Sequence, residues 1–128
     1  MFEEVLIKFI TEKILKEIFT KMNEHKLKDD VIIEFTSKLR KKLGHQLVET
    51  TLFGSRARGD NTVHSDYDFL IIVKRKEARQ KEIIYDLCTS ILDKYNSLVS
   101  FLLYDKQEWQ RKKKYPLGLN ILKEGIRV

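Results

Sequence analysis

The feature that most constrains the fold of this chain is an apolar run near its centre, from Tyr67 to Val73. The run reads Tyr-Asp-Phe-Leu-Ile-Ile-Val, and only Asp68 interrupts it. Successive side chains of a strand point to opposite faces, so a strand of this composition must be covered on both faces. Segments with helical spacing precede and follow the run, which makes helices the covering layers. The run therefore predicts a strand inside a sheet that is packed between helices.

Hydrophobic spacing divides the rest of the chain into further helices and strands. Helices are predicted from Phe2 to about His25, from Asp29 or Asp30 to Leu43, and from Lys76 to Tyr95. Strands are predicted over residues 47–53 and 98–104. A weaker helical region begins at Asp105, Pro116 interrupts it, and residues 120–128 form a helical or extended tail. The predicted fold class is α/β (α+β), a small mixed β-sheet packed with helices. The helix 76–95 can act as a crossover, so the strands on its two sides are predicted to run parallel.

The second predicted helix has clear start and stop signals. Asp29 or Asp30 is a suitable N-cap, and Gly44 is a suitable C-terminal stop. The apolar positions between them recur at helical spacing and share one face: Ile32, Phe35, Leu39 and Leu43. This face is predicted to pack against the core.

The first predicted helix has an apolar stripe that the stems of long charged side chains interrupt. The stripe consists of Leu6, Phe9, Ile10, Lys13, Ile14, Glu17, Ile18 and Met22. An amphipathic helix of this kind covers either its own sheet or a partner protein. The sequence leaves both alternatives open.

Composition places limits on the class of protein. The 128 residues predict one domain with a proper hydrophobic core. The single cysteine, Cys88, cannot form an internal disulfide and is expected to be a buried structural thiol, so a cytoplasmic protein is predicted. The charged residues Glu3, Glu4 and Lys8 argue against a signal peptide, and no apolar run is long enough for a membrane span. A net charge of +6 favours anionic partners such as nucleotide phosphates.

Two acids, Asp66 and Asp68, lie at the head of the apolar run. Residues two apart in a strand point to the same face, where two carboxylates repel each other unless a cation bridges them. Mg²⁺ binds through one or two carboxylates together with phosphate oxygens, so the pair is suited to half of a metal site. A solvated loop in which Asp66 caps a turn is the alternative. Asp68 fits this alternative poorly because the apolar residues follow it at once.

A Gly-Ser turn, Gly54 and Ser55, follows the predicted strand 47–53. Glycine permits a positive φ and lets the backbone approach a ligand closely. If Ser55 opens a helical turn, the free N–H groups of that turn face an incoming phosphate, and Arg56 or Arg58 can add charge. An ordinary turn is the alternative. The segment is not a Walker P-loop, because a second glycine followed by Lys-Ser or Lys-Thr is missing.

A Gly-Ser turn, ten intervening residues and Asp-x-Asp at the head of an apolar strand together resemble the nucleotidyltransferase signature of the DNA polymerase β superfamily. The resemblance is closest to the minimal nucleotidyltransferases, small proteins often encoded beside a HEPN-domain partner in toxin–antitoxin pairs. It rests on Gly54, Ser55, Arg56, Ala57, Arg58, Gly59, Ser65, Asp66 and Asp68, and the tail 116–126 is similar to the ending of many such proteins. It implies the polymerase β-like nucleotidyltransferase fold with an extra N-terminal helix. We predict one nucleotidyltransferase domain over residues 1–128, with a helical extension over 1–28 and the motif-bearing core over 47–128.

The resemblance implies a metal-dependent nucleotidyl transfer. Asp66 and Asp68 would be the catalytic, Mg²⁺-binding residues. Gly54, Ser55 and Arg56 would bind the phosphates of the nucleotide. AMP would pass from ATP to a hydroxyl group with pyrophosphate as the leaving group, and in the toxin–antitoxin relatives that hydroxyl belongs to a tyrosine of the HEPN protein. The expected partners are therefore ATP and a HEPN-domain protein, for which this chain would be the antitoxin.

One residue departs from the pattern of the superfamily, which usually has a third acid on the strand after the crossover helix. Ser100 stands at about that position, and Asp105 lies beyond the predicted strand. Serine is a poor base and a weak metal ligand, so an alternative is a nucleotide-binding module that neutralises its partner by contact without catalysis. A second alternative is a nucleic-acid-binding protein, which the net charge and the basic run 111–114 suggest.

Overall fold

The computed structural model describes residues 2–128 and, within them, the side chains of residues 3–18 and 28–128. The helices are α1 (Phe2–Leu27), α2 (Asp30–Leu43), α3 (Ser55–Arg58), α4 (Ala78–Tyr95), α5 (Lys106–Lys112) and α6 (Pro116–Glu124), with a 3₁₀ turn, η1 (Gly44–Gln46). The strands are β1 (Leu47–Phe53), β2 (Tyr67–Val73), β3 (Val99–Asp105) and β4 (Ile126–Arg127). The predicted fold class is confirmed.

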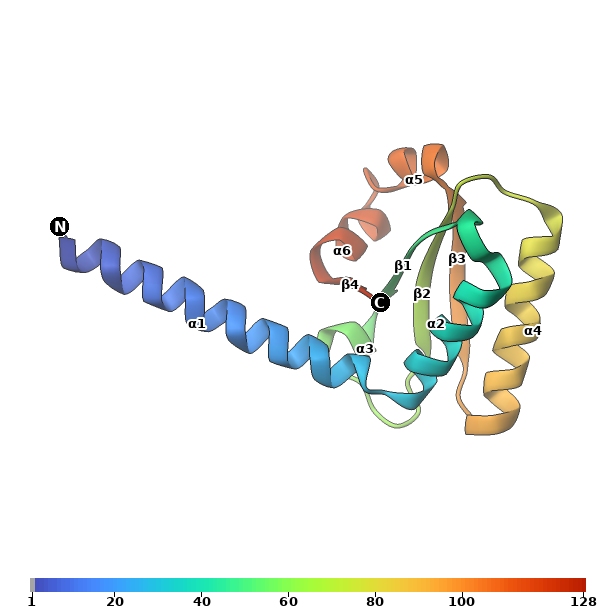
Figure 1. The fold of residues 1–128 in the computed structure, drawn as a ribbon, viewed down its shortest axis with the longest axis horizontal. Helices are drawn as coiled ribbons and strands as arrows, with labels where there is room; N and C mark the ends of the chain where they lie inside the picture. The colour runs from blue at the N-terminus through green and yellow to red at the C-terminus, as the bar shows by residue number, and fades with distance from the viewer. Residues whose placement is uncertain (1) are drawn as a thin grey trace.

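The strands form one four-stranded sheet in the order β3-β2-β1-β4 (Figure 1). Strands β2 and β3 are parallel and are joined by the crossover helix α4, as the sequence predicts. Strand β1 is antiparallel to both of its neighbours, β2 and β4. The sheet is therefore mixed. The C-terminal end of β1 and the N-terminal ends of β2 and β3 meet at one edge.

Helices cover both faces of β2. On one face, Phe69, Ile71 and Val73 pack in the core cluster that α2 and α4 contribute to, and the rings of Phe35 and Phe69 stack at 4.6 Å. On the other face, Leu70 and Ile72 pack against Trp109 of α5 and Ile121 of α6. The apolar run therefore has the two-sided cover that its composition predicts.

Helix α2 begins and ends where its signals predict. The Asp29 carboxylate accepts a hydrogen bond from the N–H of Val31 at 2.8 Å, which caps the first turn. Gly44 follows the last turn with a φ of +55°. The apolar face predicted from the sequence is buried: Ile32, Phe35, Leu39 and Leu43.

The C-terminal region forms more structure than the sequence suggests. Pro116 does not merely interrupt a helix but begins α6, where its fixed φ and missing N–H are suited to the first turn. A Cβ atom at Gly118 would clash with the backbone at Lys112, so glycine lets α6 pack directly on the end of α5. After α6, Ile126 pairs with Leu52 and adds β4 to the sheet.

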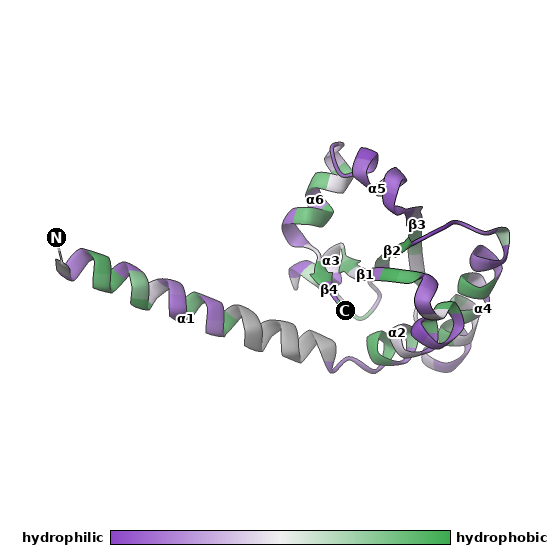
Figure 2. Ribbon diagram, turned by 45° about the horizontal axis from the view of Figure 1, so that its top comes forward, coloured by the Kyte–Doolittle hydropathy of each residue, from purple (hydrophilic) through white to green (hydrophobic). Residues whose placement is uncertain are grey.

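Helix α1 extends away from the sheet and its covering helices (Figure 1). Its described apolar side chains are 47–70% exposed: Val5, Leu6, Ile7, Phe9, Ile10, Ile14, Leu15 and Ile18. Apolar and polar residues alternate along the described part of the helix (Figure 2). The alternative in which the stripe covers the sheet is therefore wrong for these residues, while Met22 lies outside the described side chains. No helix among the described residues is long and apolar enough to cross a membrane.

Candidate functional site

The predicted site residues meet where β1 ends and where β2 and β3 begin. Asp68 lies opposite two residues of the neighbouring strands. These are Ser100 of β3 and Phe53, which ends β1 directly before Gly54. Gly54, Asp68 and Ser100 are far apart in sequence and adjacent across three neighbouring strands. The sheet therefore brings together the Gly-Ser turn, one of the two acids and Ser100, the position where the resemblance leads us to expect a third acid, at one edge.

The Asp68 carboxylate lies between Gly54 and Ser100. The Ser100 hydroxyl donates a short hydrogen bond to Oδ1 of Asp68. A Cβ atom at Gly54 would overlap Oδ2 of the same carboxylate, and the φ of Gly54 is +77°. Only glycine adopts this conformation readily, and only glycine leaves room for the acid. Gly54 is thus required both for the turn and for the position of Asp68.

The second acid, Asp66, comes immediately before β2 and is exposed. Its side chain has no hydrogen bond or ion pair with any described residue. Side chains alternate along this segment, and the intervening Tyr67 is buried in the cluster formed with α2 and α4. Asp68 therefore lies on the side of β2 opposite Tyr67. Asp66 precedes the strand, so a shared face for the two acids stays a prediction.

Arg56 stabilises the loop that carries Asp66. Its Nε donates to the carbonyl oxygen of Ser65 at 3.0 Å and an Nη donates to that of Thr62 at 3.4 Å. Its guanidinium also lies 3.9 Å from the centre of the Tyr67 ring, a cation–π contact. Phosphate binding by Arg56 stays a prediction, and in this structure its side chain positions the loop between α3 and β2.

Tyr67 joins this loop to α2, which sequence reasoning missed. Its hydroxyl donates to Oδ2 of Asp29 at 2.7 Å, the carboxylate that caps α2. Burial, together with the Asp29 carboxylate, raises the pKa of Tyr67 above its ordinary value, so the hydroxyl keeps its proton. The sequence shows only a tyrosine at the start of an apolar strand, which gives no signal of a partner 38 residues away.

The predicted helical turn after Gly54 is present as α3. The N–H groups of Ala57 and Arg58 both donate to the carbonyl oxygen of Gly54 at 3.1 Å. The N–H groups of Ser55 and Arg56 come first in the turn and have no carbonyl within the helix to bind. Arg58 pairs with Asp60 and with Glu124 of α6, which raises its pKa. These ion pairs connect the turn to the C-terminal helix.

The acids available fit Mg²⁺ held jointly with phosphate rather than a site made by protein alone. Among residues with described side chains, no cluster of three or more His, Cys, Asp or Glu could hold a metal ion. Asp105 does not supply a third acid, because it pairs with Val73 at the far end of β2 and accepts a hydrogen bond from the N–H of Glu108. Asp66 and Asp68 remain, which match the one or two carboxylates that Mg²⁺ takes beside phosphate oxygens.

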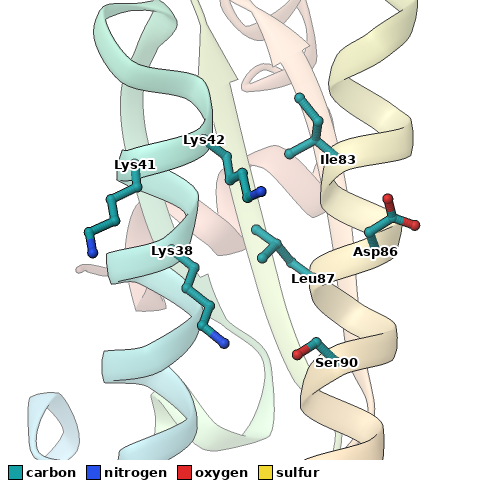
Figure 3. Close-up of a pocket in the computed structure, with 7 residues that line it drawn as sticks. All are labelled: Lys38, Lys41, Lys42, Ile83, Asp86, Leu87 and Ser90. Atoms are coloured by element: carbon teal, nitrogen blue, oxygen red, sulfur yellow. The ribbon is translucent and has the colours of Figure 1, made fainter.

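A cavity of about 480 Å³ lies elsewhere, between α2 and α4 (Figure 3). Lys38, Lys41 and Lys42 line it from α2, and Ile83 and Leu87 line it from α4. These helices cover the face of the sheet opposite Asp68. The cavity is therefore separate from the edge where the acids and the Gly-Ser turn meet.

A family model described as a nucleotidyltransferase domain matches residues 32–123, which include the turn, both acids and the crossover helix. The chain belongs to the nucleotidyltransferase domain family. This confirms the family that the sequence motifs indicate. The roles of individual residues in this nucleotidyltransferase stay predictions.

Two relatives from Methanocaldococcus jannaschii each have the name "Putative protein adenylyltransferase". One is 34% identical over 104 residues, which cover 81% of this chain and 96% of the relative. The other is 29% identical over 102 residues, which cover 77% of this chain and 69% of the relative. The similarity thus extends over most of each protein.

One solved structure supports the fold. A crystal structure from Sulfolobus solfataricus, described as a putative nucleotidyltransferase, matches with a TM-score of 0.52 and 20% identity, covering 84% of this chain and 83% of that chain. A toxin–antitoxin structure with AMP-PNP matches with a TM-score of 0.49 and 18% identity, covering 73% and 69%. The first supports the fold alone, and the second is too remote to carry an argument.

Proposed function

We propose that this chain is a Mg²⁺-dependent nucleotidyltransferase that transfers AMP from ATP to a hydroxyl group of a protein. The observation that carries the proposal is the Asp68 carboxylate, which lies directly against the Gly54 bend at one edge of the sheet. Membership of the nucleotidyltransferase family supports the reaction type. The names of the two Methanocaldococcus relatives support a protein as the acceptor.

Asp66 and Asp68 would hold Mg²⁺, which when bound offsets negative charge on the reacting phosphate oxygens. The first N–H groups of α3 and the Ser55 hydroxyl would bind the terminal phosphates of ATP. Gly54 lets those phosphates approach the backbone. Arg56 would act through the loop, since its contacts with Ser65 hold the segment that ends at Asp66.

Ser100 favours a second candidate function, a nucleotide-binding module that neutralises a partner by contact. Its hydroxyl donates to Asp68, and a serine has no carboxylate with which to accept a proton from an attacking hydroxyl. Binding needs only the turn and the two acids, whereas turnover also needs a base. The two functions therefore share a nucleotide site and differ in whether AMP is transferred.

The proposed partner is a HEPN-domain protein, for which this chain would act as antitoxin in the cytoplasm. The resemblance of the motifs to minimal nucleotidyltransferases motivates this partner. The exposed apolar side chains of α1 support it, because they form a surface that the described part of the chain leaves uncovered. We further propose one nucleotidyltransferase domain over 1–128, in which 1–28 is a binding extension and 47–128 is the core.

The test uses the chain with the HEPN protein encoded beside it and ATP labelled at either the α- or the γ-phosphate. AMP transfer labels the partner from α-labelled ATP only, whereas phosphorylation labels it from γ-labelled ATP. Asp68→Ala should abolish labelling, and Asp93→Ala, an exposed acid on α4, should leave it unchanged. No labelling by the wild-type chain, with Mg-ATP binding retained in calorimetry, would establish the binding module instead. Absence of Mg-ATP binding would remove both functions.

A further inference from the structure

A second cavity lies on the same face of the sheet as Asp68. Its volume is about 220 Å³, and it is formed between β3 and the pair of helices α5 and α6. Its lining includes Leu102, Tyr104, Trp109, Lys112, Tyr115 and Leu117. Three of these side chains are aromatic, and the rings of Tyr104 and Trp109 stack with an interplanar angle of 16°.

The cavity continues the row of side chains that begins at the site. Ser100, Leu102 and Tyr104 alternate along β3 and therefore lie on one face. The Ser100 hydroxyl bonds Asp68 on this face, and Leu102 and Tyr104 pack with the cluster of α5 and α6. Leu102 is two residues beyond Ser100, a step of about 6.6 Å along a parallel strand. The cavity therefore begins directly beside the acid site.

The order of the strands sets a path from the phosphate turn to the cavity. Gly54 ends β1, Asp68 is in the neighbouring β2, and Ser100 is in β3. Neighbouring strands are about 4.8 Å apart, so these positions form a line across the sheet. With the terminal phosphates at Gly54 and the reacting phosphate at Asp68, the attacking hydroxyl would come from the Ser100 side, so the ribose and base would turn along the strands toward Leu102. The path ends at the aromatic lining.

We propose that this cavity binds the purine base of the nucleotide, an inference that rests on the proposed nucleotide site. Aromatic side chains stack on the flat faces of bases, and this stacking is favourable for every base. The cavity is smaller than the roughly 300–1,000 Å³ of a pocket for a drug-sized ligand, which suits a single ring system rather than a whole nucleotide. Tyr115 lines the cavity and is 64% exposed, so its ring is accessible to a base from solvent.

Trp109 makes the proposal directly measurable, because it is the chain's single tryptophan and it lines the cavity. Its fluorescence is recorded while adenosine, Mg-ATP or inorganic triphosphate with Mg²⁺ is added, and calorimetry measures binding independently. Adenosine and Mg-ATP should change the emission, whereas triphosphate should bind without changing it. Binding of Mg-ATP in calorimetry with no change of Trp109 emission would overturn the proposal.

Two exposed tyrosines give a matched pair of variants. Tyr115→Ala should weaken adenosine binding by about tenfold, within the range found when one stacking aromatic is removed. Tyr85→Ala is the control, because Tyr85 is 58% exposed and packs on Phe101 on the opposite face. Equal affinities for adenosine in the two variants would count against the cavity.

A third variant separates failure of the cavity from failure of the nucleotide site. Asp66→Ala removes an exposed acid, so the variant should fold, lose affinity for Mg-ATP and keep its affinity for adenosine. If the wild-type chain binds adenosine with a change in Trp109 emission but binds neither triphosphate nor Mg-ATP, the proposed function fails and the cavity stands. If adenosine does not bind at all, the base-binding cavity is wrong.

Discussion

The contact between Gly54 and Asp68 leads to a quantitative prediction for the substitution Gly54→Ala. An added Cβ would overlap Oδ2 of Asp68, and this oxygen is at the end of a short side chain that can rotate away. Rotation would break the hydrogen bond from Ser100 and move the carboxylate off the Gly-Ser turn. We therefore expect Gly54→Ala to lose stability and Mg-ATP affinity together.

Two terms set the size of the effect on stability. The backbone at Gly54 has φ +77° and ψ −160°, a region that costs other residues about 1–3 kcal/mol. Loss of the hydrogen bond from Ser100 to a charged group adds roughly 1 kcal/mol, below the usual range because Ser100 is exposed. The free energy of unfolding should fall by about 2–4 kcal/mol.

Gly44→Ala is the matched control for Gly54→Ala. Gly44 also has a positive φ, of +55°, but a Cβ there would meet no atom within 4 Å. Urea denaturation should therefore show a loss from backbone strain alone, about 1–3 kcal/mol, and calorimetry should show unchanged Mg-ATP binding. Full Mg-ATP affinity in Gly54→Ala, with a stability loss equal to that of the control, would refute the placement of Asp68 against the turn.

Three further substitutions and one pH dependence test other contacts. Arg56→Ala removes the cation–π contact and the carbonyl hydrogen bonds, so hydrogen exchange should quicken across residues 59–66. Mg-ATP should bind about tenfold more weakly, and unchanged exchange contradicts this role. Burial raises the pKa of the Cys88 thiol to about 11, so alkylation at pH 8 should be roughly a hundredfold slower than for a free thiol, and a free-thiol rate would contradict this burial. Protein stability should fall as pH rises from 9 through 11, because the thiol of the unfolded chain ionises first. Phe9→Glu should weaken binding of the HEPN partner without altering Mg-ATP binding, because Phe9 is exposed on helix α1. Unchanged affinity for the partner would argue against α1 as the contact surface. Ser100→Asp places a second carboxylate beside Asp68, so the free energy of unfolding should fall by about 1–4 kcal/mol in EDTA and by less in Mg²⁺. Equal losses of stability in EDTA and in Mg²⁺ would argue against a metal at these acids.

The sequence predicts a helix or strand well where its hydrophobic pattern and the residues that begin and end it are close together in the chain. The apolar run gives β2 its observed bounds, and Asp29 with Gly44 does the same for α2. The predicted start of the crossover helix, Lys76, is two residues early. The side chain of Gln80, which is buried, accepts a hydrogen bond from the N–H of Glu77 and so fixes the first turn. Such a contact depends on burial, which hydrophobic spacing does not reveal.

Other features depend on contacts that no sequence window contains. Strand β4 has two residues, and it forms because Ile126 reaches Leu52 of β1 across the fold. The contacts of Arg56 with Ser65 and Tyr67 likewise need the loop to close before they exist. The sequence motif makes Arg56 and Arg58 equally suited to bind phosphate. The structure distinguishes them by their partners.

The division of the site between two parts of the chain separates binding from turnover. The connection between β1 and β2 contains Gly54 and Asp66, and β2 itself contains Asp68. These residues therefore come together when the antiparallel pair of strands forms. The position of the third acid is in β3, which reaches the site only through the crossover helix α4. A serine at position 100 can therefore remove a base without disturbing the turn or the two acids. For this reason, retention of Mg-ATP binding is compatible with both proposed functions, and only transfer of the α-phosphate label distinguishes them.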